Sequence, residues 1–281
     1  MNSDNIDNEL RINLNIIATA ITSQIKQRRY SESASTLTAD IDKARQLQKS
    51  ILPEHERRFG DYELYGVTDP AEIVGGDFFD YLEAGEEAER LGIAIGDAAS
   101  KGVSAAAEAM YISGALRMAS SFEIKITTLM RRMNELVNKI FEDDKFATLF
   151  YGELSKHESG LFLYTNAGHN PPIFYKAESK HVDILDTTGL LLGPSPNAKY
   201  YLESINFVKG DVLLLFSDGI TETMDSNSVE YGEERLINKL KKVNSLSSRE
   251  IVLEILDDVV NFSKNGNYSD DKTLVAIKRI A

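Results

Sequence analysis

The sequence contains no cysteine and no tryptophan, and only 4 of its 281 residues are histidine. Without cysteine the chain can form neither a disulfide framework nor a thiolate zinc site, and this composition suits a reducing compartment. We therefore expect a cytoplasmic protein. Because histidine is scarce as well, carboxylates are the main supply of side chains that could bind a metal ion.

Positive charge is also scarce, since 31 Lys and Arg residues stand against 44 Asp and Glu residues and give a net charge of −13. An acidic chain is a poor partner for a nucleic-acid backbone or an anionic membrane surface, so we expect neither as the main partner. Such a chain can still act on phosphate if bound metal ions reverse the local charge.

Long apolar runs are missing too. No segment approaches the roughly 18 apolar residues that a membrane span needs. The opening residues, MNSDNIDNEL, lack the basic and apolar regions of a secretory signal. We expect no membrane span.

The first fifty residues carry a helical pattern that differs from the rest of the chain. Leu10, Leu14, Ile17 and Ile21 recur at helical spacing and form a narrow apolar stripe, which Ile25 extends. A helix with one apolar stripe must bury it. The stripe packs either on another copy of the chain or a partner, which we favour, or on the domain that follows.

A polar segment at residues 31–36, SESAST, separates this pattern from a second helical pattern, which begins near Thr38 and stops at Pro53. We therefore expect two successive helices in an N-terminal segment at residues 1–52. A separate domain is expected at residues 53–281.

From about residue 60 the pattern changes to short strand-like runs joined by turns rich in glycine and acid. Strands in runs with helices segregated between them indicate an α+β layered domain with antiparallel pairing. The strand candidates are 62–67, 77–84, 90–97, 147–154, 160–167, 172–176, 181–185, 200–208, 211–218 and 273–280, and the helix candidates are 104–120, 127–141, 233–243 and 247–264.

Four of these strands carry an aspartate at one end. Asp77 begins one strand, Asp97 and Asp218 each end one, and Asp270 and Asp271 come just before the last. A single aspartate there is an ordinary turn residue. Four together indicate a site, because acids on rigid strand ends could converge if cations lie between them.

Carboxylate oxygens are hard donors that suit magnesium or manganese. Two such ions about 3.5–4 Å apart can lower the pKa of a shared water and hold a phosphoryl group for in-line attack. The sequence offers no cysteine nucleophile, no serine in a nucleophile-elbow pattern and no phosphate-binding loop. The residues thus favour metal-assisted hydrolysis of a phosphate ester.

Seven segments in fixed order resemble a known family, namely LQKSILP, VGGDFFDY, GIAIGDAASKGVSAA, ATLFYGEL, NAGHNPP, DVLLLFSDGITE and SDDKTLVAI. They resemble the bacterial serine phosphatases related to stage II sporulation protein E and RsbU, within the metal-dependent, type 2C-like protein phosphatase superfamily. The resemblance covers residues 45–281. It implies an α-β-β-α sandwich of two antiparallel sheets with helices outside.

The resemblance also implies an activity: hydrolysis of phosphoserine or phosphothreonine on a protein, with two Mn²⁺ or Mg²⁺ ions as cofactors. The implied substrate is a folded, phosphorylated regulatory protein, often a STAS-type anti-sigma-factor antagonist. Carried over by motif, Asp77 would bind the metal centre, Asp97 would bridge both ions and Ala98 would offer its backbone carbonyl. Asp218 and Asp270 would complete the set, and the four acids are the expected catalytic residues.

The chain departs from the family pattern just after Asp97. It has Ala99, Ser100, Lys101 and Gly102 where the family usually shows Ser-Gly-Lys-Gly. We expect the loss of the first glycine to stiffen or reshape this loop. The departure keeps a second hypothesis open, in which the domain is a signalling scaffold that binds a partner and catalyses little.

A third hypothesis concerns regulation. In related phosphatases the helix that enters the domain acts as a switch and a dimer element, and DIDKARQLQKSILPE matches that position. We therefore expect residues 1–52 to form a regulatory segment that drives formation of a homodimer.

Four further polar residues each have two interpretations. Asp80 and Asp271 either reach a metal through water or are turn acids. Lys101 either helps to hold substrate phosphate or is a solvated loop lysine. His169 is either catalytic or merely hydrogen-bonds the backbone in a turn before two prolines.

Overall fold

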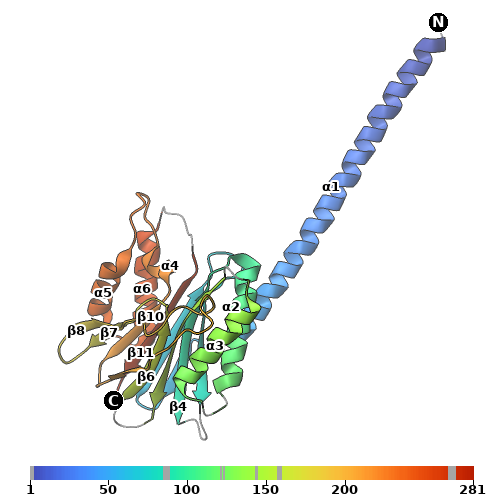
Figure 1. Cartoon of the computed structure of the whole chain (residues 1–281). Coiled ribbons are helices and arrows are strands. Elements are labelled where there is room, and N and C mark those ends of the chain that lie inside the picture. The colour runs from blue at the N-terminus through green and yellow to red at the C-terminus, as the bar shows by residue number, and fades with distance from the viewer. Residues whose placement is uncertain are drawn as a thin grey trace. The chain divides into compact units, whose positions relative to one another are not determined.

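The computed structural model describes residues 3–84, 89–120, 122, 124–142, 145–156, 160–264 and 270–281, with side chains from Leu10 onward except that of Ala84. The chain forms two compact units, Met1–Gln46 and Leu47–Ala281 (Figure 1). Among the described residues, no helix combines the length and the hydropathy that crossing a bilayer requires.

Helix α1 runs without a break from Ser3 to Ile51, so it makes up the first unit and continues into the second. The expectation of two helices separated by residues 31–36 is therefore wrong. The hydroxyl of Thr36 donates to the carbonyl of Glu32 and that of Thr38 to the carbonyl of Ala34, at 3.1 and 2.9 Å. Because these hydroxyls bond back onto the helix, the polar segment need not interrupt it.

The second unit contains two sheets in which every strand pair is antiparallel. The six-stranded sheet has the order β1-β2-β11-β10-β7-β8 and the five-stranded sheet the order β3-β4-β5-β6-β9. The strands are β1 Glu56–Phe59, β2 Tyr62–Asp69, β3 Phe78–Ala84, β4 Arg90–Ala98, β5 Ala147–Ser155, β6 Leu161–Ala167, β7 Ile173–Lys176, β8 His181–Ile184, β9 Glu203–Asn206, β10 Val212–Phe216 and β11 Lys272–Arg279.

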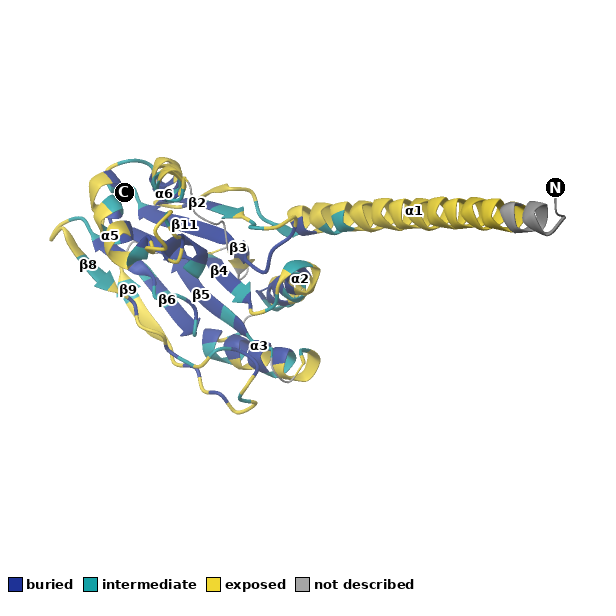
Figure 2. Cartoon of the chain, turned by 90° about the horizontal axis from the view of Figure 1, so that it is seen from above, coloured by how far each residue is buried: buried dark blue, intermediate teal, exposed yellow. Residues whose placement is uncertain are grey.

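The central strands are apolar on both faces because both faces are covered. Ile93 and Ile95 of β4 are buried between the sheets, where they belong to one core with Phe150 and Leu215. Ala94, between them in the sequence, belongs to a second core under the helices. Figure 2 shows the same burial along the middle of both sheets.

Two helices cover the outer face of each sheet. Helices α2 (Gly102–Ser120) and α3 (Ile126–Ile140) pack on the five-stranded sheet, and α5 (Gly232–Val243) and α6 (Ser248–Phe262) pack on the six-stranded one (Figure 1). The α-β-β-α sandwich is thereby confirmed. Two short elements were not predicted, β1 and helix α4 (Asp218–Thr221). Residues 85–88 of the turn expected between the strands at 77–84 and 90–97 lie outside the described residues.

Candidate active site

The pairing of the strands brings the four acids to one edge of the sandwich. Phe78, the first residue of β3, lies opposite Gly96 of β4. Asp77 comes just before Phe78 and Asp97 just after Gly96, so both acids lie at the same end of the five-stranded sheet. In the other sheet Phe216 of β10 lies opposite Leu274 of β11. This register places Asp218, two residues after Phe216, near the two acids that precede β11.

Two hydrogen bonds join the sheets at this edge. The hydroxyl of Thr273 in β11 donates to the carboxylate of Asp77 at 2.7 Å, and the backbone N–H of Gly76 donates to the carboxylate of Asp271, also at 2.7 Å. Hydrogen bonds to ionised groups are among the stronger ones in proteins. The segment before β3 is therefore fixed against β11.

Two glycines allow this close approach. A Cβ atom on Gly76 would lie 2.8 Å from the carbonyl oxygen of Ala98, and one on Gly219 would lie 2.0 Å from the carbonyl oxygen of Asp271. Both distances are too short for a real side chain. These positions require glycine because the backbone segments that carry the acids lie against one another.

The acids are close enough to repel one another. Burial, and after it the negative charges of Asp218, Asp270 and Asp271, together raise the pKa of Asp97 to about 7. Burial and the charge of Asp97 also raise the pKa of Asp77, while hydrogen bonds from Ser217 and Thr273 act in the opposite direction. For Asp218, burial is again the first cause of a raised pKa and the charge of Asp270 the second.

The donor set fits a hard divalent cation. Among the residues that the structure describes, no three His, Asp or Glu side chains form a ready-made metal cage. The carboxylates around Asp97 nevertheless act on one another's pKa, and a cation between them would turn this repulsion into attraction. Because these carboxylates offer hard oxygen donors, the site suits Mg²⁺ or Mn²⁺.

The two neighbouring acids before β11 differ in their surroundings. The carboxylate of Asp271 accepts hydrogen bonds from the backbone N–H groups of Ala71, Gly76 and Asp77, at 2.8, 2.7 and 3.3 Å. Asp270 is exposed, and its carboxylate accepts from the N–H of Asp271 at 2.9 Å. Asp271 therefore holds the loop together, while Asp270 keeps an oxygen available.

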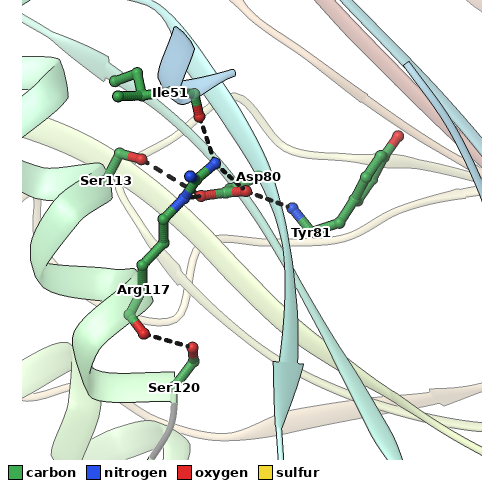
Figure 3. A network of polar contacts seen from close by, with 6 residues as sticks. All are labelled: Ile51, Asp80, Tyr81, Ser113, Arg117 and Ser120. Atoms are coloured by element: carbon green, nitrogen blue, oxygen red, sulfur yellow. Dashed lines mark hydrogen bonds and ion pairs between the residues drawn. The ribbon is translucent and has the colours of Figure 1, made fainter. Parts of the chain in front are cut away.

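Asp80 belongs to a different network (Figure 3). It is buried within strand β3 and not in a turn, and its carboxylate pairs with Arg117 of α2 and accepts from Ser113 at 3.4 Å. Arg117 also donates to the carbonyl of Ile51 at the end of α1. The sequence reasoning missed Arg117, because nothing in the sequence shows that α2 packs against this strand.

Gln48 is a second contact that the sequence reasoning missed. Its buried side chain donates to the carbonyl of Gly75 at 2.6 Å and accepts from the N–H of Gly75 at 3.2 Å, within the second unit. Gly75 lies two residues before Asp77. The last turn of α1 is thus bonded directly to the segment that carries the first acid.

The loop after Asp97, where the chain departs from the family pattern, is tied to α2. The hydroxyl of Ser100 donates to the carboxylate of Glu108 at 2.9 Å, and the ammonium group of Lys145 donates to the same carboxylate oxygen at 2.8 Å. The hydroxyl of Ser104 completes this cluster at 3.3 Å. Ser100 thus supplies a hydrogen bond that a glycine could not.

Lys101 lies at the mouth of the site. A cavity of about 40 Å³ is lined by Lys101, Ser100, Asp270 and Asp271 together with the segment around Gly76, and the Lys101 side chain is exposed. The structure therefore places the positive charge of Lys101 in the same cavity as Asp270 and Asp271, as the phosphate-binding interpretation of Lys101 requires.

The family model described as "Stage II sporulation protein E (SpoIIE)" matches residues 87–280 of the chain. Phosphoserine phosphatase RsbU of Bacillus subtilis is 27% identical over 246 residues, which are 86% of this chain and 71% of RsbU. Among solved structures, the SiaA-PP2C domain of Pseudomonas aeruginosa superimposes with a TM-score of 0.72 at 16% identity and covers 88% of this chain and 98% of that domain.

Two further structures with the same fold contain metal ions. RsbX in complex with magnesium superimposes with a TM-score of 0.59 at 17% identity, over 79% of this chain and 97% of RsbX. The catalytic domain of PstP in complex with two manganese ions superimposes with a TM-score of 0.54 at 12% identity, over 78% of this chain and all of that domain. PP2C-type homologues of the chain therefore bind Mg²⁺ or Mn²⁺.

Proposed function

The chain belongs to the stage II sporulation protein E (SpoIIE) family of PP2C-type phosphatases, and we propose that it removes phosphate from serine or threonine on a partner protein with two Mn²⁺ or Mg²⁺ ions. Asp77, Asp97, Asp218 and Asp270 would hold the ions, together with the backbone carbonyl of Ala98. The observation that carries this proposal is the arrival of these acids, from four strand ends, at one edge of the sandwich.

Asp97 is the natural residue to contact both ions. The negative charges of Asp218, Asp270 and Asp271 raise the pKa of Asp97, and the charge of Asp97 in turn raises the pKa of Asp77. Asp97 therefore interacts with the acids of both sheets. Bound divalent ions would lower the pKa of a water molecule and neutralise the charge of the phosphate. Asp97→Asn should abolish metal-dependent turnover, because the amide carries no charge.

Other residues of the chain keep the acids in place. Thr273 orients the carboxylate of Asp77, Asp271 fixes the backbone from Ala71 to Asp77, and Gly219 lets Asp218 lie against the start of β11. Lys101 would contact the phosphate of the substrate at the mouth of the site. Because the protein has no thiol and no nucleophile elbow, direct attack by water is the chemistry these groups support.

We propose a phosphorylated STAS-domain protein as the substrate, on the similarity to RsbU and its relatives. The test is to incubate the protein and Mn²⁺ with a serine-phosphorylated STAS protein and with an unfolded phosphopeptide of the same sequence. We expect faster release of phosphate from the folded protein. Equal rates would indicate that the enzyme recognises only the phosphorylated segment.

We also propose that α1 forms a homodimer. Leu10, Leu14, Ile17, Ile21 and Ile25 recur at helical spacing, and each is at least half exposed. Apolar side chains in such a row gain stability when a second helix covers them.

The alternative is a scaffold that binds a partner and catalyses little. The change at Ala99 and Ser100 favoured this hypothesis in the sequence, but the structure gives Ser100 a role in ordering the loop. Calorimetric titration with Mn²⁺ separates the two functions. The phosphatase should bind two ions per chain, whereas a scaffold has no need of either.

A further inference from the structure

His169 is a buried histidine that lies beside the acids of the candidate site. The proposed chemistry does not use it. Only 2% of its surface is exposed, and it follows the end of β6. Its backbone N–H donates to the side-chain oxygen of Asn166 at 2.8 Å, and its carbonyl accepts from the side-chain amide of Asn166 at 3.0 Å. The turn therefore holds the imidazole in one place by bonds that do not involve the ring.

The ring contacts the five-stranded sheet next to Asp97. Its Nδ1 lies 2.9 Å from the hydroxyl of Thr148. Thr148 is the residue of β5 that lies directly opposite Asp97 of β4. Thr148 therefore links the imidazole of His169 to the strand position opposite Asp97, the acid proposed to contact both ions.

The same ring lies against the six-stranded sheet. The backbone carbonyl of Phe216 raises the pKa of His169, although burial has the larger effect and lowers that pKa to about 4. Phe216 ends β10, two residues before Asp218. Nε2 is buried and makes no well-formed hydrogen bond.

The contact with Thr148 is available to the uncharged ring. At neutral pH the ring is uncharged and carries one proton. A hydroxyl both donates and accepts, so Nδ1 and the hydroxyl of Thr148 can form their hydrogen bond in either tautomer of the ring.

We propose that His169 is a positioning residue of the metal centre, whose ring holds the strand pair of Asp97 at a fixed distance from the strand end that carries Asp218. This inference rests on the proposed function, since it concerns the same acids. Groups that orient metal ligands from the second layer typically change metal affinity or activity by about 10- to 100-fold when they are removed. His169 acts through Thr148 and the end of β10, not on the substrate.

The test uses Thr148→Val, which removes the hydroxyl and keeps the shape of the side chain. Thr165→Val is the matched control, because Thr165 also lies in the five-stranded sheet and its hydroxyl bonds the backbone carbonyl of Tyr201 at 3.0 Å. Thr165 lies opposite Tyr151, away from Asp97. Each variant loses one hydroxyl that makes a side-chain hydrogen bond, so both should lose some stability.

The readout is the affinity for Mn²⁺ by calorimetry and the electron paramagnetic resonance spectrum of bound Mn²⁺, with the full chain. We expect Thr148→Val and His169→Phe to weaken Mn²⁺ binding about tenfold or more and to broaden the spectrum. Thr165→Val should bind Mn²⁺ as tightly as the wild type does. Thr148→Ser keeps the hydroxyl, so it should retain most of the affinity for Mn²⁺.

Wild-type affinity in folded Thr148→Val would overturn the role of His169 and leave the phosphatase proposal intact. If His169→Phe does not fold, the pair Thr148→Val and Thr148→Ser decides the matter alone. A wild-type protein that binds no Mn²⁺ would overturn the phosphatase proposal, and the positioning role with it.

Discussion

The carboxylate of Asp271 accepts a hydrogen bond of 2.7 Å from the backbone N–H of Gly76, 195 positions earlier in the chain. This bond and its neighbours join the segment before β3 to the start of β11. The next acid in the sequence, Asp270, is exposed and makes none of these backbone contacts. Two adjacent aspartates therefore have different tasks, one in structure and one in the proposed chemistry.

Substituting each of these acids by asparagine should separate the two tasks. Asp271→Asn should lower the free energy of unfolding by about 1–3 kcal/mol, because the buried N–H groups lose a charged acceptor. Asp270→Asn should change it by less than about 0.5 kcal/mol, as exposed substitutions do, and should lose metal-dependent turnover. Urea unfolding without metal and an aryl phosphate assay with Mn²⁺ measure both effects. If Asp270→Asn lost more stability than Asp271→Asn, the structural task assigned to Asp271 would be contradicted.

The loop after Asp97 gives a second prediction. Ser100→Gly restores the glycine of the family pattern but removes the hydrogen bond to Glu108, and glycine adds backbone freedom. We expect Mn²⁺ affinity to fall several-fold, by about 1 kcal/mol of binding free energy. Ser104→Ala is the control, since Ser104 bonds the same carboxylate from within α2. Equal effects of the two variants would show that the loop gains nothing from Ser100.

The buried His169 predicts a dependence of stability on pH. Burial lowers its pKa from 6.5 to about 4 in the folded protein, so between these values the unfolded chain binds more protons than the folded one. The contribution of His169 to the free energy of unfolding is therefore fully present above pH 6.5. It falls by about 3 kcal/mol as the pH is lowered to 4 and below.

The measurement compares wild type with His169→Asn by urea unfolding at pH values from 7 to 4. The other titrating groups cancel in the difference, so the advantage of the wild type should shrink as the solution becomes more acidic. A difference that stays constant with pH would contradict a neutral, buried imidazole.

Dimerisation through α1 is tested in the full chain with Ile17→Glu and Ile21→Glu together. Two charges in the apolar row should prevent a second helix from covering it, and light scattering should show the mass per particle falling by half. Thr19→Glu, on a residue whose hydroxyl bonds the carbonyl of Asn15, is a control outside this row. A particle mass that does not fall in the double variant, or in a chain without residues 1–52, would contradict the role of this segment.

Much of the fold was predictable because local patterns and tertiary structure agree. The apolar runs of β4 and β10 and the helix from 247 to 264 lie where the sequence indicates, and α6 begins with a capping box formed by Ser247 and Glu250. The break expected in α1 was wrong because serine and threonine are tolerated in a helix when their hydroxyls bond back to it.

The site was predictable only in part. Its acids are visible at strand ends, but the sequence cannot separate Asp270 from Asp271, whose difference depends on backbone N–H groups far away in the chain. It also gives no sign that Asp80 pairs with Arg117, because that contact depends on how α2 lies on β3. Contacts between distant segments need the register of the sheets, which no local pattern contains.

Hydrolysis of an aryl phosphate with and without Mn²⁺, in the wild type and in Asp218→Asn, tests directly whether these acids form a metal-dependent phosphatase site. We expect turnover that requires Mn²⁺ and that falls by at least about a hundredfold in the variant, since one metal ligand loses its charge. Turnover that is equal with and without Mn²⁺, or unchanged in Asp218→Asn, would contradict a metal-dependent phosphatase built on these acids.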